Sequence, residues 1–223
     1  MQRALVIGSS GGIGGALTDA LRTRLGAGLV ATLSRRDDGL DITSETAVKD
    51  CLSRQEGPFD LIFLATGGLE VAGHPPEKAL REVTPAALRA QFDLNTLGPA
   101  LVMKHALPLL PKDRRAVFAA LSARVGSIGD NRLGGWHSYR ASKAALNQIL
   151  RGAAIELRRS HPQAICLALH PGTVATPLTR AYASRHPTVA PEDAARNLLT
   201  VVDGLAPDDS GGFFDWAGKT IPW

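Results

Sequence analysis

The sequence has few cysteines, few aromatic residues and no long hydrophobic run. Its 223 residues contain only two cysteines, Cys51 and Cys166, whose separation matches no metal-binding or redox motif. No apolar run reaches the ~18 residues that a membrane-spanning helix needs, and the N-terminus lacks the layout of a signal peptide. We therefore expect a cytoplasmic protein with no membrane association.

The sequence also lacks a strong excess of charge. Its formal net charge is +4, and its basic pairs are scattered and not interleaved with aromatic residues, which argues against nucleic-acid binding. With 44% hydrophobic and 21% charged residues, the composition is that of a globular protein. The length suits one α/β domain spanning residues 1–223 and is too short for two ordinary domains.

A glycine-rich turn lies between a short apolar run and a helical pattern near the N-terminus. Residues 3–8 read as a buried strand, residues 8–15 are rich in glycine, and a helix is predicted from Ala16. Glycines permit a tight turn and close approach of the backbone, and the N–H groups at the helix start bind a pyrophosphate. The predicted dinucleotide contacts in this turn are Gly8, Ser10, Gly12, Ile13 and Gly14.

The end of the second predicted strand, residues 28–34, indicates the type of dinucleotide. An NAD site usually carries an acidic residue about 20 positions after the glycine turn, but this chain has Ser34 there, followed by Arg35. A hydroxyl and a guanidinium suit a 2′-phosphate, so NADP(H) is favoured over NAD(H). Asp37 and Asp38 follow closely and keep NAD(H) open as the alternative.

The rest of the chain alternates between apolar strands and helical segments. This order predicts a doubly wound Rossmann fold, with a mostly parallel sheet of six to seven strands and helices on both faces. Residues 40–43 are predicted to add a short strand, and residues 177–190 a mobile lid. The long helical pattern of residues 84–110 contains Asn95 shortly before Gly98 and Pro99, which predicts a functional kink. Further strands are expected at 59–65, 115–121, 163–169 and 211–216, and further helices at 45–54, around 139–150 and at 191–202.

Tyr139 and Lys143 stand four residues apart in one of these helical segments, so their side chains are expected on one helix face. An ammonium beside a phenol favours the phenolate, which predicts a lowered pKa for Tyr139. Such a tyrosine can protonate a carbonyl oxygen as a hydride reaches the carbon, or accept the proton in the reverse reaction. An ordinary surface pair is the alternative for this spacing taken alone.

Four motifs in order resemble the short-chain dehydrogenase/reductase family over essentially the whole chain. They are the Gly8/Gly12/Gly14 turn, Asn95, Tyr139-x-x-x-Lys143, and Pro171-Gly172-x-Val174-x-Thr176. The segment from Gly126 to Lys143 and the last six residues, 218–223, are similar to the subgroup of C-factor signalling proteins and sniffer-type carbonyl reductases.

This resemblance implies a role for each matching residue. Tyr139 would be the general acid/base, and Lys143 would lower its pKa and hold the nicotinamide ribose, while Asn95 would anchor a water in a proton relay. It also implies a homodimer or homotetramer that pairs through the helices carrying Asn95 and Tyr139. Further NADP(H) contacts are implied for Asp41 (adenine), Gly67 (backbone), Pro171, Gly172, Val174 (carboxamide) and Thr176.

Two departures from the family pattern bear on function. The family's Asn-Asn-Ala-Gly is replaced by residues 64–67, Leu-Ala-Thr-Gly, and its catalytic serine is replaced by Ala123. The role of the catalytic serine could be taken by Ser122, if its side chain turns inward, by Ser127, or by no serine at all. We favour Ser122. Two hypotheses follow: an NADP(H)-dependent reductase acting on a carbonyl or alcohol substrate, and a catalytically weak NADP-binding signalling protein.

Overall fold

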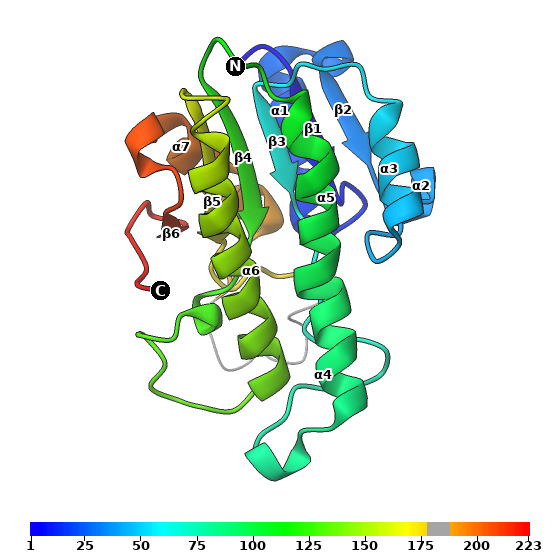
Figure 1. Cartoon of the computed structure of the whole chain (residues 1–223), viewed down its shortest axis with the longest axis vertical. Coiled ribbons are helices and arrows are strands. Elements are labelled where there is room, and N and C mark those ends of the chain that lie inside the picture. The colour runs from blue at the N-terminus through cyan, green and yellow to red at the C-terminus, as the bar shows by residue number, and fades with distance from the viewer. Residues whose placement is uncertain (178–187) are drawn as a thin grey trace.

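A six-stranded, fully parallel sheet forms the centre of the molecule (Figure 1). The computed structural model describes residues 1–177 and 188–223. The strand order is β2-β1-β3-β4-β5-β6, so the chain moves outward in both directions from β1 and β3. The strands are β1 (Ala4–Ile7), β2 (Val30–Leu33), β3 (Leu61–Leu64), β4 (Ala116–Leu121), β5 (Ala164–His170) and β6 (Phe213–Asp215).

The inner strands β1, β3 and β4 are buried on both faces, which explains why their sequences are continuously apolar rather than alternating. In the register, Ile7 of β1 lies level with Leu33 of β2 and with Leu64 of β3. The carboxyl ends of these strands therefore meet along one edge of the sheet, where open α/β sheets bind their ligands.

Helices cover both faces of the sheet. One hydrophobic cluster packs α3 (Glu45–Ser53), α5 (Gly98–Ala106) and α6 (His137–Leu157) against one face, and α5 and α6 stand in front of the sheet in Figure 1. A second cluster packs α1 (Gly12–Leu25) and α7 (Pro191–Gly204) against the other face. The predicted doubly wound Rossmann fold is confirmed. Among the described helices, none is long and apolar enough to cross a bilayer.

The segment after β2 differs from the prediction. A short helix, α2 (Arg35–Asp38), follows Ser34 directly, and residues 40–43 form a turn rather than a strand. The reason is local: the Asp41 carboxylate accepts hydrogen bonds from the backbone N–H and the hydroxyl of Thr43, which closes a turn. Short 3₁₀ helices occur at Ala27–Leu29, Leu80–Glu82, Leu107–Leu109, Arg124–Gly126 and Pro207–Asp209.

The long helical pattern of residues 84–110 is broken where the kink was predicted. Thr84 caps α4 (Pro85–Phe92), a π-helical segment spans Asp93–Leu97, and α5 then begins at Gly98. Pro99 has no backbone N–H, so a regular α-helical ladder cannot pass through it, and π segments of this kind often mark functional sites. Asn95 lies within the π segment and is fully buried.

Candidate active site

The glycine turn between β1 and α1 is built for close backbone approach. Gly8 has a φ of +92°, which favours glycine, and a Cβ at Gly14 would lie 2.1 Å from the Gly8 carbonyl oxygen. A side chain at Gly14 would therefore push α1 off the strand. The first turn of α1 contains no acidic residue, and its N-cap, Gly11, provides no side-chain bond. These N–H groups fit an anionic pyrophosphate.

The Pro171–Thr176 segment after β5 reaches back to this turn. A Cβ at Gly12 would lie 2.7 Å from Cγ2 of Thr176, so the segment packs directly on the start of α1. Val174 is buried and forms a parallel bridge with Val189, and Gly172 has a φ of +78° beside Trp216. The two segments predicted to hold the dinucleotide are thus neighbours. Most of the predicted lid, residues 178–187, lies outside the described residues.

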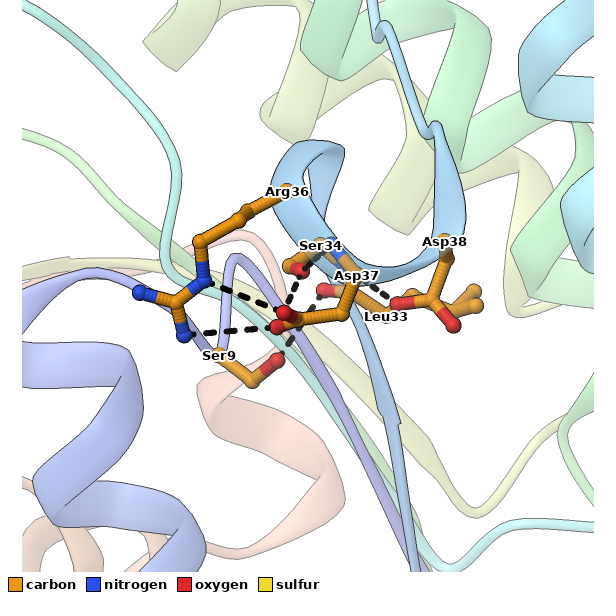
Figure 2. Close-up of polar contacts among 6 residues, drawn as sticks. All are labelled: Ser9, Leu33, Ser34, Arg36, Asp37 and Asp38. Carbon is orange, nitrogen blue, oxygen red and sulfur yellow. Dashed lines mark hydrogen bonds and ion pairs between the residues drawn. The ribbon is translucent and has the colours of Figure 1, made fainter.

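Ser34 caps the short helix α2, and its predicted contact with the cofactor stays a prediction. Figure 2 shows its hydroxyl donating to the Asp37 carboxylate at 2.9 Å, and the same oxygen accepts the Asp37 N–H as the cap of α2. Ser34 is buried, and its N–H donates to Asp38 at 2.7 Å. Asp37 and Asp38, the acidic residues that made NAD(H) the alternative cofactor, therefore both hydrogen-bond to Ser34 and stabilise this turn.

Arg36 lies beside the glycine turn, next to the predicted contact Arg35 in sequence. Its guanidinium pairs with Asp37 at 3.0 Å and lies near Ser9 in Figure 2. Arg36 and Arg22 line a cavity of about 350 Å³ together with Ser9 and Thr18, between the start of α1 and β2. The Arg36 side chain is largely exposed. The predicted contact of Arg35 with the 2′-phosphate stays a prediction.

Tyr139 and Lys143 lie one turn apart on α6, and both are buried. The Lys143 ammonium lies 6.0 Å from the centroid of the Tyr139 ring and donates to the Leu121 carbonyl oxygen at 3.1 Å. Burial raises the pKa of Tyr139 and lowers the pKa of Lys143 to about 8. The predicted lowering of the Tyr139 pKa is therefore wrong, because loss of solvent disfavours the phenolate.

Asn95 faces this pair from the π segment. Its amide nitrogen donates to the Gly68 carbonyl oxygen at 2.9 Å, and its Oδ1 accepts the Gly68 N–H at 3.0 Å. The same nitrogen donates to Gln91, one turn earlier, at 2.6 Å. A Cβ at Gly67 would lie 3.0 Å from both Asn95 Oδ1 and Lys143 Nζ. Asn95 and Lys143 thus converge on the backbone at the end of β3.

Both candidate serines have hydrogen-bonded hydroxyls. Ser122 is buried and donates to Oδ1 of Asn147 on α6 at 2.6 Å. Ser127 donates to the Pro222 carbonyl oxygen at 2.5 Å and accepts the N–H of Asp130. Ala123 lies between Ser122 and the following 3₁₀ turn and is partly exposed, whereas both serines are buried. The catalytic role of Ser122 stays a prediction.

Comparison with known proteins identifies the family of this chain. A family model described as "Enoyl-(Acyl carrier protein) reductase" matches residues 13–202. A 1-hydroxy-2-glutathionyl-2-methyl-3-butene dehydrogenase of Rhodococcus sp. (strain AD45) is 33% identical, with all of both chains covered. This chain belongs to the short-chain dehydrogenase/reductase family. The C-signal protein of Myxococcus xanthus is 38% identical over 146 residues, which are 65% of this chain and 84% of that protein.

Solved structures of the same fold include carbonyl reductases. NADPH-bound carbonyl reductase from chicken fatty liver superposes with a TM-score of 0.83 at 23% identity, covering 100% of this chain and 99% of that chain. The carbonyl reductase Sniffer of D. melanogaster gives 0.80 at 21% identity, with full coverage of both chains. The protein is an oxidoreductase of the short-chain dehydrogenase/reductase family.

Two residues that bond to predicted site residues were missed by the sequence analysis: Gln91, which accepts from Asn95, and Asn147, which accepts from Ser122. Gln91 precedes Asn95 by four residues, and Asn147 follows Lys143 by four. Each pair shares a helix face, so the spacing itself was a signal that could have found them. The remaining predicted contacts follow β1 (Ser10 and Ile13) or β2 (Arg35 and Asp41) in the chain, and their contacts with a cofactor stay predictions. Among the described residues, no cluster of three or more His, Cys, Asp or Glu is arranged to hold a metal ion.

Proposed function

We propose that this protein is an NADP(H)-dependent oxidoreductase that interconverts a carbonyl group and a secondary alcohol on a small molecule, with Tyr139 as general acid/base. The observation that carries the proposal is the buried Tyr139–Lys143 pair on α6, converging with Asn95 on Gly67 at the carboxyl edge of the sheet. Among the described residues the Lys143 ammonium has no carboxylate partner, and burying a phenol and an ammonium in this way is costly, which is typical of a functional site.

The choice of NADP(H) rests on Arg36 and Arg22 in the cavity beside the glycine turn. A guanidinium binds a 2′-phosphate through paired charged hydrogen bonds. Solved structures of the same fold are described with bound NADPH or NADP, among them the chicken carbonyl reductase and a Burkholderia multivorans protein. The N–H groups at the start of α1 would hold the pyrophosphate, and Thr176 would close over it from the segment after β5.

The residues of this chain would then handle the proton. The raised pKa of Tyr139 keeps its phenol protonated at neutral pH, ready to donate to a carbonyl oxygen. Lys143, whose pKa burial lowers to about 8, remains mostly charged at pH 7 and would hold the ribose hydroxyls. Asn95 would support the relay that returns a proton to Tyr139. When bound, the nicotinamide supplies or accepts the hydride.

Ala123 leaves the position of the family serine without a hydrogen-bond donor. Loss of one donor to a developing oxyanion costs about 10²–10³ in rate. Turnover of simple carbonyl compounds is therefore expected to be slow, and substrates that bring their own hydrogen-bonding groups are expected to react faster.

The test is a fluorescence titration with NADPH and NADH, followed by a panel of ketones and aldehydes with the tighter cofactor. The panel includes, in the oxidation direction, the glutathionyl alcohol for which the Rhodococcus relative is named. Tyr139→Phe is expected to lower turnover by about 10²–10⁴-fold and to leave cofactor binding in place. Unchanged turnover would overturn the role of Tyr139, and binding without any turnover would favour a signalling role.

We also propose a cytoplasmic protein that is one domain over residues 1–223 and pairs as a homodimer or homotetramer. Both cysteines are free thiols, as in a reducing compartment. Leu88 of α4, Leu97 of the π-helical segment and Ile155 of α6 are apolar side chains exposed to solvent. Light scattering tests the assembly, and a monomer at micromolar concentration would refute it.

A further inference from the structure

The helix that carries Tyr139 does not cap its own N-terminus. α6 begins at His137, and the preceding residue, Trp136, has a φ of 50° and a ψ of 41° and makes no capping bond with its side chain. Left-handed backbone is unfavourable for a large side chain. The first turn of α6 also contains no acidic residue. The start of α6 therefore depends on groups from elsewhere in the chain.

Glu77, from the loop between β3 and α4, supplies the missing cap. Its Oε2 accepts the Ser138 N–H at 3.2 Å, and its Oε1 accepts the Ser138 hydroxyl. Its backbone carbonyl accepts the Trp136 N–H at 2.5 Å. Glu77 is only 5% exposed although it is a carboxylate. A carboxylate at a helix N-terminus is stabilised by the helix dipole as well as by the hydrogen bonds.

We propose that Glu77 is a positioning residue, which fixes the first turn of α6 and thereby holds the Tyr139 hydroxyl where it exchanges a proton with the substrate. The proposal rests on the proposed function of Tyr139. Glu77 accepts from both hydrogen-bond donors of Ser138, the residue directly before Tyr139. The Trp136 ring meets the Tyr139 ring edge-on, with centroids 6.3 Å apart and planes at 63°. Movement of either neighbour therefore moves the phenol.

The charge of Glu77 is suited to this task. Burial acts to raise the pKa of Glu77, but the hydrogen bonds from Ser138 more than compensate, so its pKa lies below the ordinary value and it is ionised at neutral pH. Removal of the carboxylate leaves the Ser138 N–H and hydroxyl without their acceptor in a buried site, which favours fraying of the first turn.

A structural anchor alone would lower the melting temperature without altering the chemistry of the folded enzyme. The experiment therefore compares Glu77→Ala and Glu77→Gln with a matched control, Glu82→Gln. Glu82 lies in the same loop and accepts the Lys78 N–H at 2.8 Å, but it is exposed and makes no bond to α6. kcat, KM and the Kd for NADPH are measured well below the melting temperature, on the best carbonyl substrate of the panel.

A second readout observes Tyr139 without any substrate. The chain has two tyrosines, so Tyr182→Phe leaves Tyr139 as the sole tyrosine. In that background, NMR of protein labelled with ¹³C-tyrosine follows its ring signal. Glu77→Ala is expected to lower kcat by about 10–100-fold, as a misplacement near 1 Å would, with little change in Kd, and to broaden or split the ring signal. Glu77→Gln, which keeps one acceptor oxygen, should fall between Glu77→Ala and Glu82→Gln.

Native kcat and a single sharp Tyr139 signal in folded Glu77→Ala would overturn the proposal. A fall in kcat matched by an equal loss of NADPH affinity would also overturn it, because that pattern indicates general collapse of the site. If Glu77→Ala does not fold, the same measurements are made on Glu77→Gln and Ser138→Ala. A native kcat in both variants would refute the proposal that Glu77 positions Tyr139. Failure of the proposed function would appear separately, as unchanged turnover in Tyr139→Phe.

Discussion

Replacement of Lys143 by methionine is expected to stabilise the unliganded protein while abolishing its activity. Lys143 is only 3% exposed, and burial lowers its pKa from 10.5 to about 8. Because one pKa unit corresponds to 1.36 kcal/mol, the buried charge costs the folded state about 3 kcal/mol at neutral pH. Methionine has a similar length and carries no charge, so it removes this cost.

The gain is partly offset by the loss of a hydrogen bond. The Lys143 ammonium donates to the Leu121 carbonyl oxygen, and an acceptor left unpaired costs about 1 kcal/mol. The net stabilisation of Lys143→Met is then about 2 kcal/mol, or a rise in Tm of about 4–8 °C for a chain of this size. Such a loss of folding stability at a residue needed for activity is a stability–activity trade-off.

The effect has a defined pH dependence. The folded-state pKa of Lys143 lies below the unfolded value, so between pH 8 and 10.5 the unfolded chain binds more protons. The stability of the native protein relative to Lys143→Met therefore rises through this window. The advantage of the variant is fully present below about pH 8 and disappears as the pH approaches 10.5.

Thermal unfolding of both proteins across this pH range is the assay. Lys104→Met is the control, since Lys104 is largely exposed in a pair with Glu45 and its replacement should have little effect. NADPH should raise the Tm of the native protein more than that of Lys143→Met. A variant less stable than the native protein at pH 7 would refute the reasoning.

Three further predictions concern the glycine turn, the cofactor and the missing serine. Arg36→Ala is expected to weaken NADPH binding by about 10–100-fold and to leave NADH binding unchanged, whereas Arg35→Ala should have a smaller effect in the same titration. Ala123→Ser is expected to raise kcat on simple ketones by up to about 10²-fold, measured by steady-state kinetics. Gly14→Ala should destabilise the protein by about 1–3 kcal/mol or more in denaturant unfolding, because its Cβ would collide with the Gly8 carbonyl.

Each of these three predictions can be checked against a control variant or a result that would contradict it. Equal loss of NADPH and NADH affinity in Arg36→Ala would remove Arg36 from the 2′-phosphate site. An unchanged kcat in a folded Ala123→Ser would mean that this position does not face the reacting oxygen. Gly152→Ala, in the middle of α6 with open space around its Cβ, should stabilise by about 0.5–1 kcal/mol on helix propensity.

Features that depend on neighbours in the sequence were predicted well. The apolar runs are buried strands because a parallel sheet covered on both faces leaves no polar side. The glycine turn, the Thr84 cap and the kink at Asn95 follow from backbone constraints within a few residues. The spacing of Tyr139 and Lys143 placed both on one face of α6, because helix geometry fixes the direction of residues four apart.

Features that depend on partners distant in sequence were decided only by the tertiary structure. Ser122 is engaged by Asn147 and Ser34 by Asp37, so the hydroxyls that looked available are already bonded. Burial, which no local pattern reveals, reversed the expected direction of the Tyr139 pKa. Glu77 reaches the start of α6 from a loop 61 residues earlier in the chain. The sequence by itself determined which residues could share a face, whereas solvent exclusion and long-range hydrogen bonds determined which of them are free to act.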